Sequence, residues 1–131
     1  RVFAEIARVL RPGGGLFVDV PFLHEIHHAP HDHFRYTPYA LEALAQGAGL
    51  DVMEIRPSGG YFRSLAHLLE AAPTVIHGNT VWTLLVRGLV ARPLQGLGWG
   101  IRKIQYILDL YDGNQRFTCG YHCVFRKPLV R

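Results

Sequence analysis

One stretch near the start of the chain constrains the fold more than any other: residues 8–21, Arg-Val-Leu-Arg-Pro-Gly-Gly-Gly-Leu-Phe-Val-Asp-Val-Pro. Apolar residues at helical spacing run into it and predict a helix over residues 2–11. Pro12 and the glycines at 13–15 end that helix and give the backbone the freedom that a tight turn needs. Residues 16–20 form an apolar run broken only by Asp19, which predicts a strand covered on both faces and ended by Pro21.

A polar loop rich in histidine follows this strand. Residues 22–36 contain histidines at positions 24, 27, 28, 31 and 33. Thr37 and Pro38 then suit a helix N-cap and a first helical position, and the pattern predicts a helix over 38–48 and a strand over 51–56. Ligands of open α/β sheets bind beyond the carboxyl ends of strands, so this loop is where we expect the functional site.

The character of the chain changes between residues 61 and 111. Apolar spacing predicts helices near 62–72, 80–91 and 100–111, with Pro73 and Arg92-Pro93 as breaks between them. Charged side chains here are mostly basic, and Arg87 and Arg92 interrupt the most apolar part well short of the ~20 residues that a membrane span needs. Two interpretations stay open: a lid or packing subdomain, or a surface that lies on a membrane, with Trp82 and Trp99 as interfacial anchors in the second.

Alternating side chains predict a last strand over residues 117–126. The two cysteines, Cys119 and Cys123, lie in it, roughly 13 Å apart at ~3.3 Å per residue. A disulfide needs Cα atoms within about 7 Å, so we expect both thiols to be free. Free thiols and the lack of a signal peptide predict a cytoplasmic, or membrane-peripheral, location.

The bulk properties exclude some classes of protein. Hydrophobic residues make up 49% and charged residues 18% of the 131 residues, which excludes a disordered chain. The net charge of +4 permits an anionic partner, but no aromatic and basic residues alternate as in nucleic-acid modules, so we expect no nucleic acid partner. The chain begins at Arg1 inside a helical pattern, and we expect it to be part of a longer protein.

Three segments together resemble a known family. Glu5-x-x-Arg8-Val-Leu-Arg-Pro-Gly-Gly with its buried strand, His28-x-Pro30-x-Asp32-x-x-Arg35-Tyr-Thr37 with its helix, and the strand ending at Pro128 occur here in family order. They resemble the second half of class I S-adenosylmethionine-dependent methyltransferases, and more closely the type 11 methyltransferase group. The resemblance covers about 70 residues.

The resemblance implies a fold and a cofactor. It implies an α/β fold: the C-terminal part of a Rossmann-like methyltransferase sheet, about three strands with the last antiparallel, and a helical insertion at 61–111. Residues 1–131 would be one partial domain, divided into 1–60, the insertion and 112–131. The implied cofactor is S-adenosylmethionine, but the family's glycine loop after the first strand is absent, because the glycines at 13–15 follow a helix and precede a strand. No cofactor-binding residue is identified in this chain, which we expect to be inactive alone.

The loop supplies the candidate site residues. His28 and Asp32 carry the family pattern and are the catalytic candidates, since methyl transfer needs an acceptor that is positioned and deprotonated. His24, Arg35 and Tyr36 are candidates for binding substrate or bracing the loop, and Asp32 with Arg35 could serve as a brace instead of a catalytic pair. The alternative without a functional role is a solvated loop whose histidines form hydrogen bonds with the backbone. No recognised metal motif supports a metal site, and we predict none.

Two functions follow from different classes. The first is a substrate-side methyltransferase fragment acting on an unidentified acceptor, either a small molecule or a lipid- or sugar-linked compound. The second is a non-catalytic, basic amphipathic α/β module that binds a membrane surface or a partner protein. Composition and periodicity alone reach only an α/β domain, so the preference for the first depends on the resemblance.

Overall fold

The chain forms two compact units in a computed structural model that describes residues 1–113 and 116–129. The first unit consists of Arg1–Ser58 and Cys119–Arg131, and the second of Gly59–Thr118. The helical insertion predicted at 61–111 lies within the second unit. That the whole chain is one methyltransferase-like domain stays a prediction.

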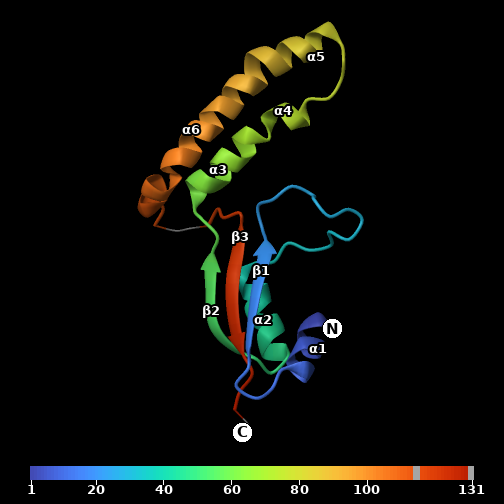
Figure 1. The fold of residues 1–131 in the computed structure, drawn as a ribbon, viewed down its shortest axis with the longest axis vertical. Coiled ribbons are helices and arrows are strands. Elements are labelled where there is room, and N and C mark those ends of the chain that lie inside the picture. The colour runs from blue at the N-terminus through green and yellow to red at the C-terminus, as the bar shows by residue number, and fades with distance from the viewer. Residues whose placement is uncertain (114–115, 130–131) are drawn as a thin grey trace. The chain divides into compact units, whose positions relative to one another are not determined.

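A three-stranded sheet organises the first unit (Figure 1). Its strands are β1 (Gly15–Pro21), β2 (Asp51–Pro57) and β3 (Gly120–Arg126). The order is β1-β3-β2, and β3 runs antiparallel to both neighbours, which confirms the predicted direction of the last strand. β1 and β2 point the same way and never pair with each other, because the strand that closes the chain lies between them.

The core lies on one face of this sheet. The helices α1 (Val2–Val9) and α2 (Pro38–Gly47) belong to this unit, and Figure 1 shows α2 behind the strands. The buried core cluster combines residues from both helices, from β3 and from the turn before β2: Ala7, Leu41, Ala45, Leu50, Tyr121, Cys123 and Phe125. The Phe3 ring meets the fully buried Phe125 ring edge-on, with 5.6 Å between centroids. Alternation along β3 therefore supplies the centre of the core.

The opposite face of the sheet is exposed, which corrects the expectation that β1 is covered on both sides. Leu16, Val18 and Val20 pack against the core, whereas Phe17 keeps 78% of its surface exposed. The apolar run is thus an alternating strand in which one outward position is a phenylalanine.

A bulge in β2 keeps its apolar side chains on the core face. The pairing with β3 skips Met53, so that Val52 faces Phe125 and Glu54 faces Val124. Without this extra residue, Val52 and Ile55 would point to opposite faces, since their spacing is odd. With it, both pack against the core.

The last strand begins at Gly120, three residues later than predicted. The Cys119 carbonyl accepts a hydrogen bond from the Phe22 amide, 2.8 Å away, just beyond β1. A Cβ atom on Gly120 would lie 2.4 Å from the Val20 carbonyl oxygen, so only glycine fits where β3 enters the sheet. No disulfide joins Cys119 and Cys123, as predicted, and burial raises the pKa of the Cys123 thiol to about 11.

The helix α2 starts as the sequence predicts. The Thr37 hydroxyl accepts a hydrogen bond from the Ala40 amide at 3.2 Å, and Pro38 occupies the first helical position. The cap satisfies an amide that has no partner inside the helix. The strand near 51–56 is confirmed as well.

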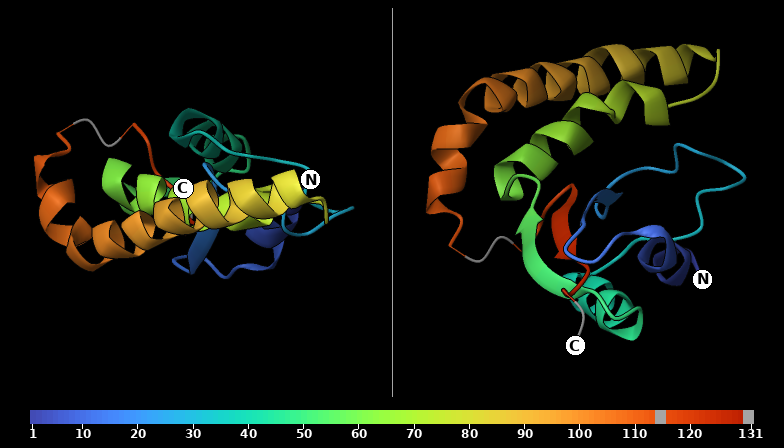
Figure 2. Two further views of the ribbon diagram at one scale, coloured as in Figure 1. Left: turned by 90° about the horizontal axis from the view of Figure 1, so that it is seen from above. Right: turned by 60° about the horizontal axis from the view of Figure 1, so that its bottom comes forward.

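Helices make up the second unit. These are α3 (Tyr61–Glu70), α4 (Ala72–Val75), α5 (Val81–Val86), the π-helical turn η1 (Arg87–Ala91), α6 (Arg92–Leu108) and the 3-10 turn η2 (Asp109–Tyr111). Figures 1 and 2 show α5 and α6 as one continuous rod that packs alongside α3. The break predicted at Arg92-Pro93 and the helix start predicted at 100 are therefore wrong.

The π-helical turn explains why Pro93 does not break this rod. Proline clashes with the carbonyl one turn before it and lacks an amide hydrogen to bond it. Here the turn before Pro93 is wider, and the Arg92 amide bonds the Arg87 carbonyl, five residues back. Pro93 then falls within the first turn of α6, where a missing amide costs little.

Close contact and charge hold α3 against α6. A Cβ atom on Gly98 would lie 2.9 Å from the Ala66 carbonyl oxygen, so the two backbones approach closely there. One turn along, Arg102 donates two hydrogen bonds to the Glu70 carboxylate, at 2.6 and 2.5 Å.

The start of α3 is capped from the far end of the rod. The Asp109 carboxylate accepts hydrogen bonds from the Gly60 and Phe62 amides, and Asp112 accepts one from Tyr61. Carboxylates at a helix N-terminus also oppose the positive end of the helix dipole. Among the described residues, no helix combines the length and the apolar character needed to cross a bilayer.

A lysine from the end of the chain caps α1. Lys127 donates hydrogen bonds from Nζ to the carbonyl oxygens of Ala7 and Leu10, at 2.7 and 2.8 Å. These carbonyls have no amide partner within the helix, and a cation there also complements the helix dipole. The contact ties the segment after β3 to the helix that precedes β1.

We predict that Lys127→Met lowers the free energy of unfolding by about 1–3 kcal/mol, because it keeps the aliphatic stem but removes two charge-assisted hydrogen bonds. Urea unfolding followed by circular dichroism measures the change. Arg126→Met is the matched control, since it removes an exposed cation at the neighbouring position, and it should stay within about 0.5 kcal/mol of the wild type. Equal losses from both substitutions would show that the cap contributes nothing.

Candidate functional site

The loop between β1 and α2 is closed by one arginine. Arg35 pairs through both terminal nitrogens with the Asp32 carboxylate, and Nη2 to Oδ2 measures 2.7 Å. The same nitrogen donates to the carbonyl oxygens of Glu25, at 2.9 Å, and His24, at 3.4 Å. A single guanidinium thus holds the outgoing and the returning halves of the loop together.

Asp32 is the centre of this arrangement. Its side chain is only 7% exposed, and its Oδ2 atom also accepts a hydrogen bond from the His27 amide at 3.1 Å. The hydrogen bonds from Arg35 hold the pKa of Asp32 far below its usual range, with the His27 amide adding to the effect. A carboxylate that holds a proton so weakly is a poor general base, and the contacts favour bracing as its role.

The lowered pKa also fixes the pH range in which the brace works. The folded loop binds the Asp32 proton less well than the unfolded chain does. The pair therefore contributes its full stability above the ordinary aspartate pKa of about 3.9 and loses it as the pH falls below that value. At neutral pH the brace is fully charged.

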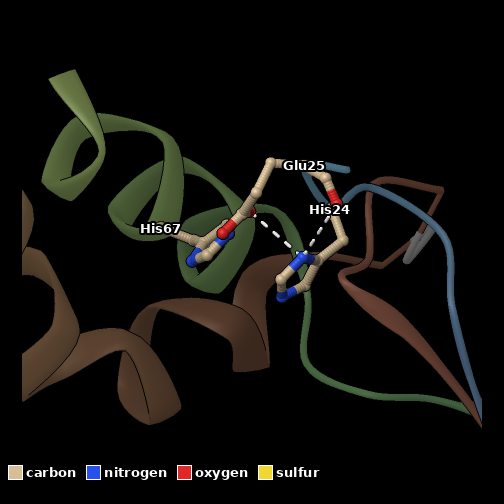
Figure 3. A group of neighbouring side chains, drawn as sticks. All are labelled: His24, Glu25 and His67. Atoms are coloured by element: carbon tan, nitrogen blue, oxygen red, sulfur yellow. Dashed lines mark hydrogen bonds and ion pairs between the residues drawn. The ribbon is translucent and has the colours of Figure 1, made fainter. Parts of the chain in front are cut away.

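The rings of His24, His27 and His28 form a row in which each ring is tilted against the next. Ring centroids lie 4.7 Å apart between His24 and His27 and 4.6 Å apart between His27 and His28. His24 also approaches the Glu25 carboxylate, with 3.1 Å from Nδ1 to Oε2, as Figure 3 shows. His27 directs Nδ1 to the Glu25 carbonyl oxygen at 2.9 Å. His67, the other residue labelled in Figure 3, is on α3 in the second unit.

His28 differs from its two neighbours in the row. Within the described part of the chain, neither of its ring nitrogens has a hydrogen-bond partner, and the residue is exposed. Its imidazole can therefore accept a proton from a ligand without first losing an internal contact. Of the two catalytic candidates, His28 is the one that is exposed in the loop.

The loop encloses an open hollow of about 700 Å³. Imidazoles and two aromatic rings surround it, and its lining residues are Pro21, His27, His28, Ala29, His31, Asp32, His33, Phe34 and Tyr36. Tyr36 stacks on Phe34 with 5.6 Å between centroids and also packs against the core, so that side of the hollow is anchored. The hollow can take a polar molecule, accept a proton from it and stack against its flat parts.

The five candidate residues divide into two groups. His28, Asp32 and Tyr36 line the hollow, whereas Arg35 and His24 lie outside its lining and belong to the brace and the histidine row. Their roles toward a substrate stay predictions. Sequence reasoning missed His27, which contacts both Asp32 and Glu25 through its amide and its ring. No spacing rule identifies such a contact in an irregular loop.

A second hollow lies on the exposed face of the sheet. It measures about 530 Å³, and Asp19 and His122 pair within it across the β1–β3 ladder. The sequence left the role of Asp19 open, because only the antiparallel register brings His122 opposite it. Both side chains are more than half exposed, so the pair belongs to a solvated surface.

The glycine turn before β1 does not form a cofactor cradle. Gly13, which has φ +78°, donates its amide to the Lys127 carbonyl at 2.8 Å, and Gly14 donates to the Arg11 carbonyl at 2.9 Å. Amides used inside the fold are not available to a ligand. The amides of Gly13 and Gly14 are therefore not available to hold the cofactor that the family resemblance implies.

Comparisons with known proteins leave the family open. No protein-family model matches the chain, and no curated protein matches it. Among solved structures, the chain is similar to one described as the crystal structure of the [4+2]-cyclase SpnF, at 18% sequence identity and a TM-score of 0.48. The similarity covers 98% of this chain but only 43% of the cyclase. A likeness this weak carries no argument about activity.

We predict that Asp32→Asn opens the loop, since it removes the charge that holds Arg35. Arg35 is the one trypsin site within residues 22–36, and its side chain is 25% exposed in the closed loop. Tryptic cleavage after Arg35, followed by mass spectrometry, should become severalfold faster, because proteolysis reports the population of the open loop.

Glu25→Gln is the control for this experiment. It makes the same charge change in the same loop, but the Glu25 side chain is 57% exposed, and the hydrogen bond from Arg35 goes to the Glu25 backbone carbonyl. Cleavage after Arg35 should keep the wild-type rate in this variant. The brace is refuted if Asp32→Asn is cut no faster than Glu25→Gln.

Proposed function

We propose that this chain is the substrate-side part of an S-adenosylmethionine-dependent methyltransferase. The sequence resemblance to the type 11 group is the starting point. The observation that carries the proposal is the position of the loop: residues 22–36 follow the carboxyl end of β1, and a strand antiparallel to β1 closes the sheet beside it. This is where the resemblance expects the acceptor-binding residues.

The loop residues have chemically distinct roles in this proposal. A methyl acceptor must be held in line and must lose a proton, and these are tasks for the protein. His28 is the proposed base, since its ring is exposed in the hollow and free of hydrogen bonds to the described residues. Asp32 and Arg35 are positioning residues that keep the loop closed, while Tyr36 and the histidine row limit what enters.

The acceptor class follows from the lining of the hollow. Several imidazoles and the Phe34–Tyr36 stack favour a compound with a proton-bearing group next to a flat or apolar part. Small molecules and lipid- or sugar-linked compounds both belong to this class. We place the main contacts to the cofactor outside the residues described here, because the glycine turn is occupied by internal hydrogen bonds.

Calorimetric titration with S-adenosylhomocysteine tests the proposal. This product of the cofactor should not bind the 131-residue chain, and it should bind the chain extended by the sequence encoded upstream of it. Asp32→Asn in the extended chain should leave this affinity unchanged, since Asp32 is assigned to the acceptor side. Binding by neither form contradicts the methyltransferase assignment, and binding by the short chain contradicts the placement of the cofactor.

A further inference from the structure

The rod formed by α5, η1 and α6 has one face that stays exposed in the described part of the chain. The side that packs on α3 and α4 is marked by Gly98 and Ala91, both buried. The other side carries large apolar residues that recur at helical spacing and that we call the apolar ridge: Trp82, Leu85, Leu89, Leu97, Ile104 and Ile107. Each is at least 44% exposed, and Trp82 and Leu89 exceed 70%. Apolar surface of this extent usually marks an interaction site.

A basic and aromatic stripe borders the ridge. Arg92, Trp99 and Lys103 lie seven and four residues apart on α6, so at 3.6 residues per turn they share one side of the helix. All three are exposed, and among the described residues the side chains of Arg92 and Lys103 have no ion-pair or hydrogen-bond partner. Arg102, by contrast, is used by Glu70. The stripe therefore presents two uncompensated cations and an indole along one edge of the ridge.

The charge pattern favours an anionic partner. No acidic residue occurs between Glu70 and Asp109, whereas Arg87, Arg92, Arg102 and Lys103 do. A second copy of this chain would bring the same cations against each other with no carboxylate between them, which is unfavourable. Anionic lipid headgroups match the stripe, and the acyl region matches the ridge.

We propose that the apolar ridge and its basic stripe dock this helical unit on the surface of an anionic lipid bilayer, with the rod lying parallel to the membrane plane. Leu89 and its neighbours enter the boundary between headgroups and acyl chains, while Arg92 and Lys103 extend their cationic ends to the phosphates. Trp99 lies at the headgroup level, where indoles are favoured. This inference does not rest on the proposed methyl transfer.

The two tryptophans of the chain make the test direct, because Trp82 is on the ridge and Trp99 on the stripe. The full chain is titrated with vesicles of phosphatidylcholine containing about one third phosphatidylserine. Tryptophan emission should shift to shorter wavelength, and lipids brominated on the acyl chain should quench it. Vesicles of phosphatidylcholine alone should bind more weakly, and added salt should weaken the binding to anionic vesicles.

Two sets of variants separate the ridge from the stripe. Leu89→Asp and, independently, Leu97→Asp should lower vesicle partitioning about tenfold or more. Each substitution removes a leucine that the proposal buries in the lipid and introduces a negative charge, which the anionic headgroups repel. Arg92→Gln and Lys103→Gln should lower it about fivefold each. Tyr39→Asp and Arg126→Gln make comparable changes at exposed positions in the first unit and should leave partitioning unchanged.

Circular dichroism shows whether each variant keeps its helices. If one of the two leucine substitutions disrupts the local structure, the other still tests the ridge. Absence of binding by the wild type overturns the proposal. The proposal is also overturned if Leu89→Asp and Leu97→Asp, both folded, bind vesicles as strongly as the wild type does. A wild type that ignores vesicles but self-associates in sedimentation, and that Leu89→Asp converts to a monomer, assigns the ridge to a second copy of the chain instead.

Discussion

The sheet of the first unit depends on β3, the last strand in the sequence, which lies between β1 and β2. Among the described residues, β1 and β2 pair only with β3, so every ladder hydrogen bond of this described sheet involves Gly120–Arg126. The same strand buries Tyr121, Cys123 and Phe125 in the core, and Gly120 admits it next to the Val20 carbonyl. Lys127 then fastens α1 from the end of that strand. The sheet of the first unit therefore needs a strand that follows the whole helical segment in the sequence.

This constraint also positions the candidate site. Pairing with β3 holds β1 up to Pro21, and the bond from the Phe22 amide to Cys119 extends that support into the loop. Beyond that point the loop is held by the Arg35 guanidinium and the Asp32 carboxylate, and by no regular secondary structure. A carboxylate used this way cannot easily serve as a base, so of the two catalytic candidates His28 is the one whose ring has no hydrogen bond to the described residues. Rigidity and reactivity are thus divided between different residues of one loop.

The local features were the predictable ones. Thr37 and Pro38 predicted the start of α2, and the glycine turn predicted the start of β1. The resemblance to the type 11 group predicted an antiparallel last strand. Contacts between distant residues were not predictable: Lys127 reaches α1 across 117 residues, and Asp19 meets His122 only through the ladder. Two local patterns led to wrong predictions. Pro93 does not break the helix, because a π-helical turn precedes it. The apolar run of β1 does not indicate a strand covered on both faces, because one face stays exposed. In the site, spacing indicated the Asp32–Arg35 pair but not the part that His27 plays in it.

Native-state hydrogen exchange tests the dependence of the sheet on β3 most directly. Because β1 and β2 bond only to β3, no ladder amide of either strand should exchange more slowly than the slowest amides of β3. The three strands should also lose protection together as denaturant is added, whatever the helices of the second unit do. Amides of β1 or β2 that outlast those of β3 would contradict this account, since they would require a partner that the described sheet does not contain.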